Sequence, residues 1–201
     1  MKILQIIFLC LITTSVYAQF PSELWHEGKV VLINQDTLEG TIKYDLDKDI
    51  IQLSGKGKIE AYTSRNVLYF SILDTSTKRF RQFYALPYNE IADFNTPRFF
   101  ELFYEGKLTL LAREYITIQT SNFGPPGLSG SSYSRQVLAY DYYFLRQGGS
   151  IVLYRKNKKE LLLNMRKYEN EMKSFIKRNR LHIDQREDLI QIFDHYNSLI
   201  K

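Results

Sequence analysis

A two-residue alternation of apolar and polar side chains runs through most of this chain, from Gly28 to Tyr154. In residues 37–44, apolar or small residues occupy the even positions and polar residues the odd ones. Such alternation is typical of β-strands that bury one face. About ten runs of this kind follow one another, separated by short turn-forming segments, which predicts an antiparallel meander.

The expected turns contain Gly, Asn, Asp or Ser, which favour tight backbone reversals. They lie at residues 34–36, 54–57, 105–106 and 147–149. Two longer segments interrupt the pattern. Residues 87–97 carry two prolines and predict a loop, and residues 121–134 are rich in Gly, Ser and Pro and predict a long mobile loop. Such a loop is either functional or simply disordered.

After Asn157 the spacing of apolar residues becomes helical. We expect Asn157 to cap a first helix, with Glu160 completing a capping box. A second helix is expected to stop at Asn179 or Arg180. Asp184 is expected to cap a last helix, again with a glutamate three residues on. The predicted buried face of that helix comprises Leu189, Ile192, Phe193, Tyr196 and Leu199.

The expected fold is therefore α+β. A mainly antiparallel sheet, curved or partly closed, spans residues 19–154, and a two- to three-helix segment at residues 155–201 packs on it. An outer-membrane barrel is disfavoured because many of the strands have only five to seven residues. With 44% hydrophobic and 14% aromatic residues, the chain is too apolar to be intrinsically disordered.

The first 18 residues have the order of a secretory signal peptide. Lys2 supplies a charge, residues 3–12 form an apolar run, and residues 16–18 (Val-Tyr-Ala) suit cleavage after Ala18. The run is about half as long as the roughly 20 residues of a membrane-spanning helix, so a retained anchor is disfavoured. We therefore expect an exported protein, periplasmic or secreted, with no transmembrane segment after cleavage.

The single cysteine, Cys10, lies inside the apolar run. Its surroundings do not match a lipoprotein cleavage site, because Leu9 precedes it and little chain lies upstream. Cleavage after Ala18 leaves no cysteine in the remaining chain. Disulfides, cysteine nucleophiles and cysteine metal ligands are then excluded, and the fold depends on its own core.

Positive charge is concentrated in the C-terminal segment. Residues 155–201 hold 12 Lys+Arg against 7 Asp+Glu, whereas residues 19–154 hold 14 against 15. The densest group comprises Lys173, Lys177, Arg178 and Arg180. These residues are candidates for contact with an anionic surface, although Glu169 partly neutralises the group and a solvated helix face explains it as well. Nucleic acid is disfavoured as a partner because the protein is expected to be exported.

No catalytic, metal or cofactor motif is complete in this sequence. The acids at positions 45, 47 and 49 resemble a calcium loop, but Ile50 and Lys56 replace its required Gly and acidic ligand. Residues 127–131 lack the second glycine of a nucleophile elbow. The three histidines, His26, His182 and His195, show no metal-binding spacing. We therefore expect no metal or cofactor and assign no catalytic residue.

Several segments resemble a diffuse group of exported bacterial proteins of unknown function. They include residues 28–32, 36–44, 65–70, 100–111 and 142–145, and the ending formed by residues 176–181 and 196–197. The resemblance covers most of the chain after Ala18. It implies an exported sheet domain with a helical tail, and it implies no activity or site residues.

Three functions remain open at this point. The first is a non-enzymatic cell-envelope protein that binds a protein or envelope ligand through its sheet or through residues 121–134. The second is an envelope hydrolase whose carboxylates are assembled by the fold, with Glu101, Glu105 and Glu114 as candidates and Glu101 and Glu105 on one strand face. The third is a peripheral binder of anionic membrane surfaces. We expect the first, so an enzyme is the less favoured reading.

Overall fold

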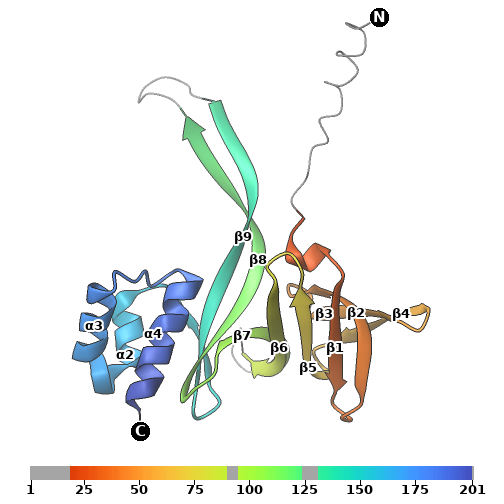
Figure 1. Ribbon diagram of the computed structural model, residues 1–201, viewed down its shortest axis with the longest axis horizontal. Helices are drawn as coiled ribbons and strands as arrows, with labels where there is room; N and C mark the ends of the chain where they lie inside the picture. The colour runs from red at the N-terminus through yellow and green to blue at the C-terminus, as the bar shows by residue number, and fades with distance from the viewer. Residues whose placement is uncertain (1–18, 90–94, 124–130, 201) are drawn as a thin grey trace, which may run out of the picture.

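The protein is α+β in a computed structural model that describes residues 19–89, 95–123 and 131–200 (Figure 1). A short 3₁₀ helix, η1 (Pro21–Glu23), precedes ten antiparallel strands. Three α-helices and a second 3₁₀ helix, η2 (Arg166–Tyr168), follow them in the described chain. The sheet is open, with the strand order β10-β9-β8-β7-β6-β5-β1-β2-β3-β4. The expected fold class is confirmed.

The strands are short except for two. Their bounds are β1 (His26–Leu32), β2 (Thr37–Asp45), β3 (Ile50–Gly55), β4 (Lys58–Thr63), β5 (Val67–Asp74), β6 (Arg79–Tyr88), β7 (Thr96–Tyr104), β8 (Leu108–Phe123), β9 (Ser131–Arg146) and β10 (Ile151–Tyr154). The expected turns separate them, and Gln35, Lys56 and Gly149 adopt positive φ there. Sixteen residues in each of β8 and β9 make that hairpin the longest in the sheet.

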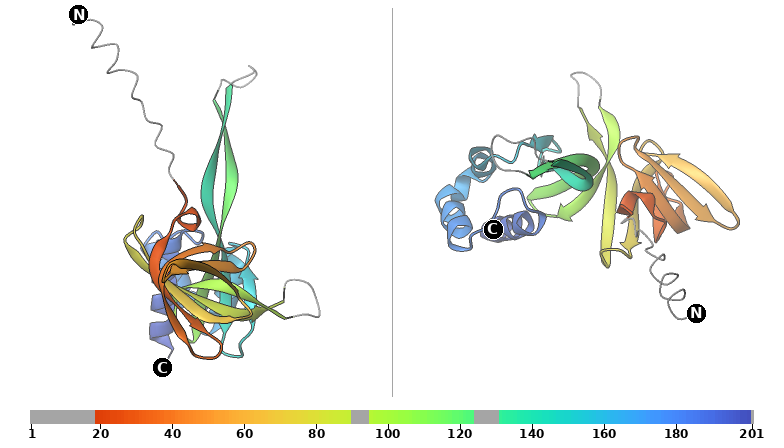
Figure 2. Two further views of the ribbon diagram at one scale, coloured as in Figure 1. Left: turned by 90° about the vertical axis from the view of Figure 1, so that its right-hand side faces the viewer. Right: turned by 90° about the horizontal axis from the view of Figure 1, so that it is seen from above.

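Two glycines allow the N-terminal half of the sheet to curl. Gly28 in β1 and Gly40 in β2 are cross-strand neighbours. A Cβ atom at Gly28 would lie 2.2 Å from the backbone oxygen of Ser71, and one at Gly40 would lie 2.3 Å from that of Ser54. Only glycine permits this close approach. Strands β1–β5 consequently curl over their inner face, as the two views in Figure 2 show.

The curled half of the sheet encloses a hydrophobic core of its own. Large side chains from β1 to β7 meet inside it, among them Val30, Phe70, Phe83 and Phe99. The rings of Phe70 and Phe83 stack with centroids 4.5 Å apart, and Phe99 meets Phe70 edge-on at 5.1 Å. These aromatic contacts join strands β5, β6 and β7 on the concave side.

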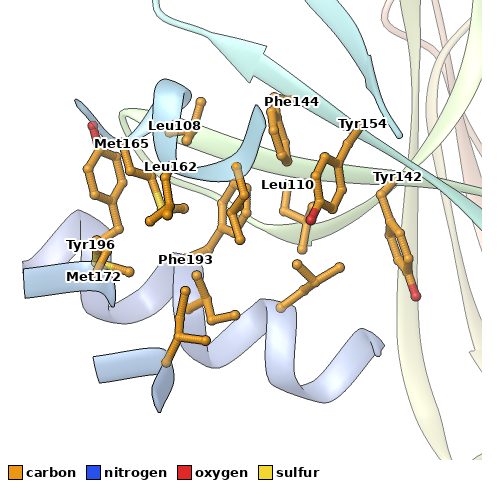
Figure 3. Packing of buried hydrophobic residues seen from close by; sticks show 14 of the residues in the cluster. Leu108, Leu110, Tyr142, Phe144, Tyr154, Leu162, Met165, Met172, Phe193 and Tyr196 are labelled. Carbon is orange, nitrogen blue, oxygen red and sulfur yellow. The ribbon is translucent and has the colours of Figure 1, made fainter. Parts of the chain in front are cut away.

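A second core lies between the other end of the sheet and the helices α2 (Lys158–Asn164), α3 (Glu169–Arg178) and α4 (Arg186–Leu199). Figure 3 shows Phe193 of α4 pointing toward Leu110 and Phe144 of the sheet. The rings of Phe144 and Phe193 are 5.4 Å apart. Four of the five apolar residues predicted for the last helix are buried, and Leu199 is partly buried.

The helix ends agree in part with expectation. Asn157 caps α2 as predicted, because its side chain accepts hydrogen bonds from two backbone N–H groups. Glu160 instead accepts from the backbone of Arg155, so the capping box does not form. Asn179 ends α3, as expected. The predicted cap at Asp184 is wrong by one residue, because α4 begins after Gln185.

Both predicted loops are shorter in the structure than expected. Pro87 and Pro97 are paired with each other at the ends of β6 and β7, so the connection is shorter than residues 87–97. In the second segment, β8 continues to Phe123 and β9 begins at Ser131. Strand pairing along this hairpin overrides the local preference of Ser and Asn for turns. Residues 124–130 of the predicted loop, and the predicted signal peptide at residues 1–18, lie outside the described residues.

Within the described part of the chain, no helix has the length and apolar character that a bilayer crossing requires.

Candidate functional site

A buried ionic network connects the curled part of the sheet to β8. At its centre is Arg81 of β6, whose Nε and Nη2 donate to the two oxygens of Glu101 at 2.9 and 2.6 Å. Nη2 also donates to Glu114 of β8 at 2.7 Å. Nη1 donates to the hydroxyl of Tyr44 at 2.7 Å and to Asp74 at 3.4 Å. Each of the five N–H groups of this guanidinium therefore has an acceptor.

Tyr44 completes the network from β2. Its hydroxyl accepts from Arg81 and donates to Oε1 of Glu114 at 2.6 Å. All four carboxylate oxygens of Glu101 and Glu114 accept a hydrogen bond, and both residues are at most 5% exposed. A network satisfied to this degree stabilises one arrangement of the strands that carry it.

The charges in the network do not balance, because one guanidinium faces the carboxylates of Asp74, Glu101 and Glu114. Burial raises the pKa of Glu101, and the nearby Arg81 only partly offsets this. Burial also acts to raise the pKa of Asp74, but hydrogen bonds from Ser76 and Thr77 outweigh it and lower that pKa. Burial raises the pKa of the Tyr44 hydroxyl, which therefore stays protonated and donates.

A second ionic cluster holds β8 at Arg113, the residue directly before Glu114. Asp49, in the turn after β2, accepts from Arg113 of β8 at 2.8 Å and from Arg98 of β7 at 2.9 Å. It also accepts from the backbone N–H of Phe99 at 2.7 Å. Arg113 further donates to the backbone oxygens of Phe99 and Leu46. The turn between β2 and β3 is thereby fastened to β7 and β8.

Two hollows flank this junction and share Asp47, Glu114, Tyr115 and Ile116 as lining residues. The smaller, of about 270 Å³, has additional acidic lining residues, Glu23 and Asp45. The larger, of about 460 Å³, is also lined by Arg98, Arg113 and Asp141. Asp45 already pairs with Lys48, and Glu23 accepts from the backbone of Phe20.

Beyond this junction, β8 and β9 leave the sheet together as a two-stranded arm, which we define as residues 115–123 and 131–139. The described pairing of β7 with β8 ends at Ala112, and that of β10 with β9 ends at Tyr142. Within the described chain, each arm strand pairs only with the other. Figure 1 shows the arm projecting well beyond the sheet and the helices.

The arm carries exposed apolar side chains on both faces. Ile116, Ile118 and Leu138 lie on the face that continues the helix-covered face of β8 and β9, and Tyr133 lies on the other. Ile118 is 67% exposed and Tyr133 is 62% exposed. A two-stranded ribbon without further packing is marginally stable in water, so this arm is suited to binding a partner.

The candidate hydrolase carboxylates are brought together only in part. Glu101 and Glu114 meet at Arg81, but Glu105 follows the last residue of β7 and is exposed. The prediction that Glu101 and Glu105 share a strand face is therefore wrong, because β7 ends before Glu105. Glu101 is buried, and only Glu114 lines the hollows.

The predicted basic group lies on α3 and just after it. Lys173 pairs with Glu169 at 2.7 Å, as the spacing indicated. Lys177, Arg178 and Arg180 are exposed and make no ion pair with any described residue. Lys177 and Arg178 lie in the last helical turn, where positive charge stabilises a helix end without any ligand.

The remaining candidate residues make ordinary turn and packing contacts. Among the described residues, no three His, Cys, Asp or Glu side chains are arranged so that they could hold a metal ion. Nε2 of His26 lies 2.7 Å from the backbone oxygen of Pro21, and His195 stacks on Phe175 with ring centroids 3.8 Å apart. Asp45 and Asp49 take part in the β2–β3 turn and its ion pairs. Residues 127–130 lie outside the described residues.

Sequence reasoning missed Arg81, the role of Tyr44 in the network, and the arm. A signal for the network was present, because Arg81 shares strand parity with the core residue Phe83, and Glu114 shares it with Ala112. A charged residue at an inward position needs a buried partner. The alternation predicts the inward position, but it does not identify partners that are 33 residues apart, as Arg81 and Glu114 are.

The sequence matches no family model, and neither a curated protein nor a solved structure shows significant similarity to it.

Proposed function

We propose that this is an exported, non-enzymatic cell-envelope protein that binds a partner protein through the arm. The arm projects from the body and exposes Ile118 and Tyr133, and this observation carries the proposal. Large exposed apolar side chains on a projecting element are typical of an interaction surface.

The ionic clusters support this role because they hold the arm at its base. Arg113 and Glu114 are consecutive residues of β8, directly before the arm begins at Tyr115. Arg113 is fastened to Asp49, and Glu114 to Tyr44 and Arg81. A firmly held base limits the orientations of the arm and lowers the entropic cost of binding.

The network also favours binding over catalysis. A general acid or base must reach the proton that it transfers. Here the oxygens of Glu101 and Glu114 already accept hydrogen bonds from Arg81 and Tyr44. These carboxylates hold strands together, so the hydrolase alternative has no accessible acid–base pair within this network.

Export is the second part of the proposal and rests on the sequence of residues 1–18. A short charged start, an apolar run and a small-residue cleavage site have the order of a secretory signal peptide. Mass spectrometry of the protein from fractionated cells tests this directly. The expected mature N-terminus is Gln19, and an intact Met1 on protein from the cell interior would contradict export.

Site-specific photocrosslinking in intact cells tests the binding surface. A photoreactive residue at Ile118 is expected to crosslink to one protein species repeatedly. The matched control is Ile59 in β4, which is 62% exposed but lies on the sheet body. Equal crosslinking from both positions, or none from the arm, would overturn the proposal.

A shortened arm provides the complementary test. Ile116 and Leu138 are cross-strand neighbours, so an Asn-Gly turn can join them in place of residues 117–137. The variant is expected to keep the folded body and to lose the crosslinks seen from neighbouring arm positions such as Tyr115. Unchanged crosslinking would contradict the assignment of the arm as the binding element.

A second candidate function is contact with an anionic membrane surface through Lys177, Arg178 and Arg180, because they are exposed and without an ion pair among the described residues. Co-sedimentation with vesicles containing anionic lipid tests it. Binding should weaken with salt and in the triple Gln variant. Binding that is absent, or indifferent to salt, would remove this candidate.

A further inference from the structure

The two outer edges of the sheet are protected against pairing with another chain. At one end, β4 has Lys58 and Glu60 on either side of Ile59, and the two charged side chains pair at 2.8 Å. At the other end, β10 is only four residues long. Charged residues and short strands are the usual means by which sheets avoid edge-to-edge association.

The strands of the arm are neither short nor rich in charged residues. Residues 115–123 of β8 contain no charged residue and no proline, and residues 131–139 of β9 contain only Arg135. The outer backbone edge of each arm strand has no strand partner among the described residues. A long edge of uncharged and β-branched residues is a template for strand addition.

We propose that the β8 edge of the arm pairs antiparallel with the same edge of a second copy of this chain. The four arm strands would then form one continuous sheet in the order β9-β8-β8-β9 across a two-fold axis. This inference rests on the proposed function of the arm as the binding element, and it names the partner.

Charge permits a second copy as the occupant and favours β8 over β9 as the edge. The β8 edge brings no like charges together, although the chain as a whole has a formal net charge of +5. Pairing through β9 would bring Arg135 toward its symmetry mate, and like charges that face each other across strands are destabilising. The isologous β8 pairing is therefore the better of the two.

The pattern of side chains selects a register centred on Ile118. In this register Ile118 faces its own mate, and Ile116 faces Thr120 of the other copy. These residues share one face of the arm with the partly buried Leu138, so the pairing gathers Ile116 and Ile118, which are exposed in the single chain. Cross-strand contacts between β-branched residues stabilise such a pair.

The outer part of the arm stands clear of the body, where a second arm can reach it. The arm extends beyond the sheet and the helices in the views of Figures 1 and 2. Two arms side by side in opposite directions leave the bodies at opposite ends of the shared sheet. The closed two-fold arrangement also limits the assembly to a dimer.

Sedimentation equilibrium of the purified protein, from about 1 to 100 μM, tests the inference. The parent protein is expected to reach twice the monomer mass with rising concentration. Ile118→Lys and Ile118→Glu are each expected to stay monomeric, because like charges then face each other. An equimolar mixture of the two variants is expected to recover the dimer, which only pairing between copies at this position explains.

Matched controls separate the β8 edge from other surfaces. Ile59→Lys changes an equally exposed isoleucine on β4 and is expected to leave the dimer intact. Tyr133→Lys changes the other arm strand and is also expected to have little effect. Loss of the dimer in Tyr133→Lys but not in Ile118→Lys would overturn the choice of edge. Near-native circular dichroism of each variant confirms folding.

Single cysteines test the register. Antiparallel residues that face each other have Cα atoms about 4.5–5.5 Å apart, a distance that a disulfide spans. Ile118→Cys is expected to form a disulfide-linked dimer with itself. Thr120→Cys is expected to do so only when mixed with Ile116→Cys. The parent, whose single cysteine is Cys10, serves as the control.

The outcomes distinguish this inference from the function on which it rests. A protein that stays monomeric throughout, yet crosslinks from Ile118 to a different protein in cells, would overturn the second copy as partner and leave the binding role of the arm. A monomeric protein with no arm crosslinks in cells would overturn both.

Discussion

The hydroxyl of Tyr44 in β2 donates a hydrogen bond to Glu114 Oε1 in β8 at 2.6 Å, although β1, β5, β6 and β7 lie between these strands in the sheet. This contact exists because the sheet curls until β2 meets the start of the arm. The curled body thereby determines where the arm leaves it.

Tyr44→Phe removes a hydroxyl that both accepts from Arg81 and donates to Glu114. The two charged groups remain buried with one partner fewer, so we expect a loss of about 1 to 3 kcal/mol in the free energy of unfolding. Urea denaturation measures it. The control is Tyr62→Phe, which removes a hydroxyl that donates to Glu60 at a less buried site. This change should lower the free energy of unfolding by less than about 0.5 kcal/mol. Equal losses would contradict a special role for Tyr44.

Glu101→Gln should flatten the pH dependence of stability. The pKa of Glu101 is raised in the folded state above its ordinary value of about 4.5, so the folded protein holds this proton more tightly than the unfolded chain. The resulting stabilisation is complete below pH 4.5 and is lost as pH rises through the raised pKa.

The comparison is the slope of unfolding free energy against pH above 4.5, which should be more negative in the parent than in Glu101→Gln. Asp74 acts in the opposite direction, because its pKa is lowered and its contribution is lost only as pH falls below 3.8. Identical slopes in parent and variant above pH 4.5 would show that Glu101 has an ordinary pKa.

Gly28→Ala should destabilise the curled half of the sheet. The added Cβ would lie 2.2 Å from the backbone oxygen of Ser71, so strand β1 or β5 must shift. We expect a loss of about 1 to 3 kcal/mol, as for overpacking in a core. Gly148→Ala is the control, because nothing lies within 4 Å of its Cβ position, and its thermal midpoint should be close to that of the parent. A parent-like midpoint for Gly28→Ala would refute this account of the curl.

Asn197→Ala should loosen helix α4 from the sheet. The Asn197 amide accepts from the backbone N–H of Leu108 at 3.1 Å and donates to its backbone oxygen at 3.0 Å, as a neighbouring strand would. Leaving both groups unpaired should cost about 1 to 3 kcal/mol. Hydrogen exchange at Leu108 should accelerate. Ser198→Ala, at an exposed neighbour in the same helix, should leave this exchange rate unchanged.

Much of the fold follows from local pattern. The alternation in residues 37–44 predicted the inward positions of Ile42 and Tyr44, and both are buried. The helical spacing predicted the buried Phe193 and Ile192 in the same way. Each of these inferences needs only the period of an element, which the nearest neighbours in the chain determine.

The candidate site was less accessible to such reasoning. The sequence offers Glu101 and Glu114 as acids for the fold to assemble, but it does not point to Arg81, which joins them. The arm was missed because Ser131 to Ser134 have a turn-like composition, whereas their state depends on pairing with residues 120–123. A polar strand segment carries little hydrophobic signal, so only its partner strand distinguishes it from a loop.

By itself, the sequence determined the order of strands and helices along the chain, the alternating faces of residues 37–44 and the basic character of the C-terminal segment. Only the tertiary structure decided that Tyr44, Arg81 and Glu114 meet, and that β8 and β9 extend together as an arm. The physical reason is the separation along the chain over which each interaction acts. Side-chain alternation and helix spacing act between residues a few positions apart, whereas the ionic network and the arm depend on how far the sheet curls. That curl requires glycine at positions such as Gly28, where a Cβ atom would meet the backbone oxygen of Ser71.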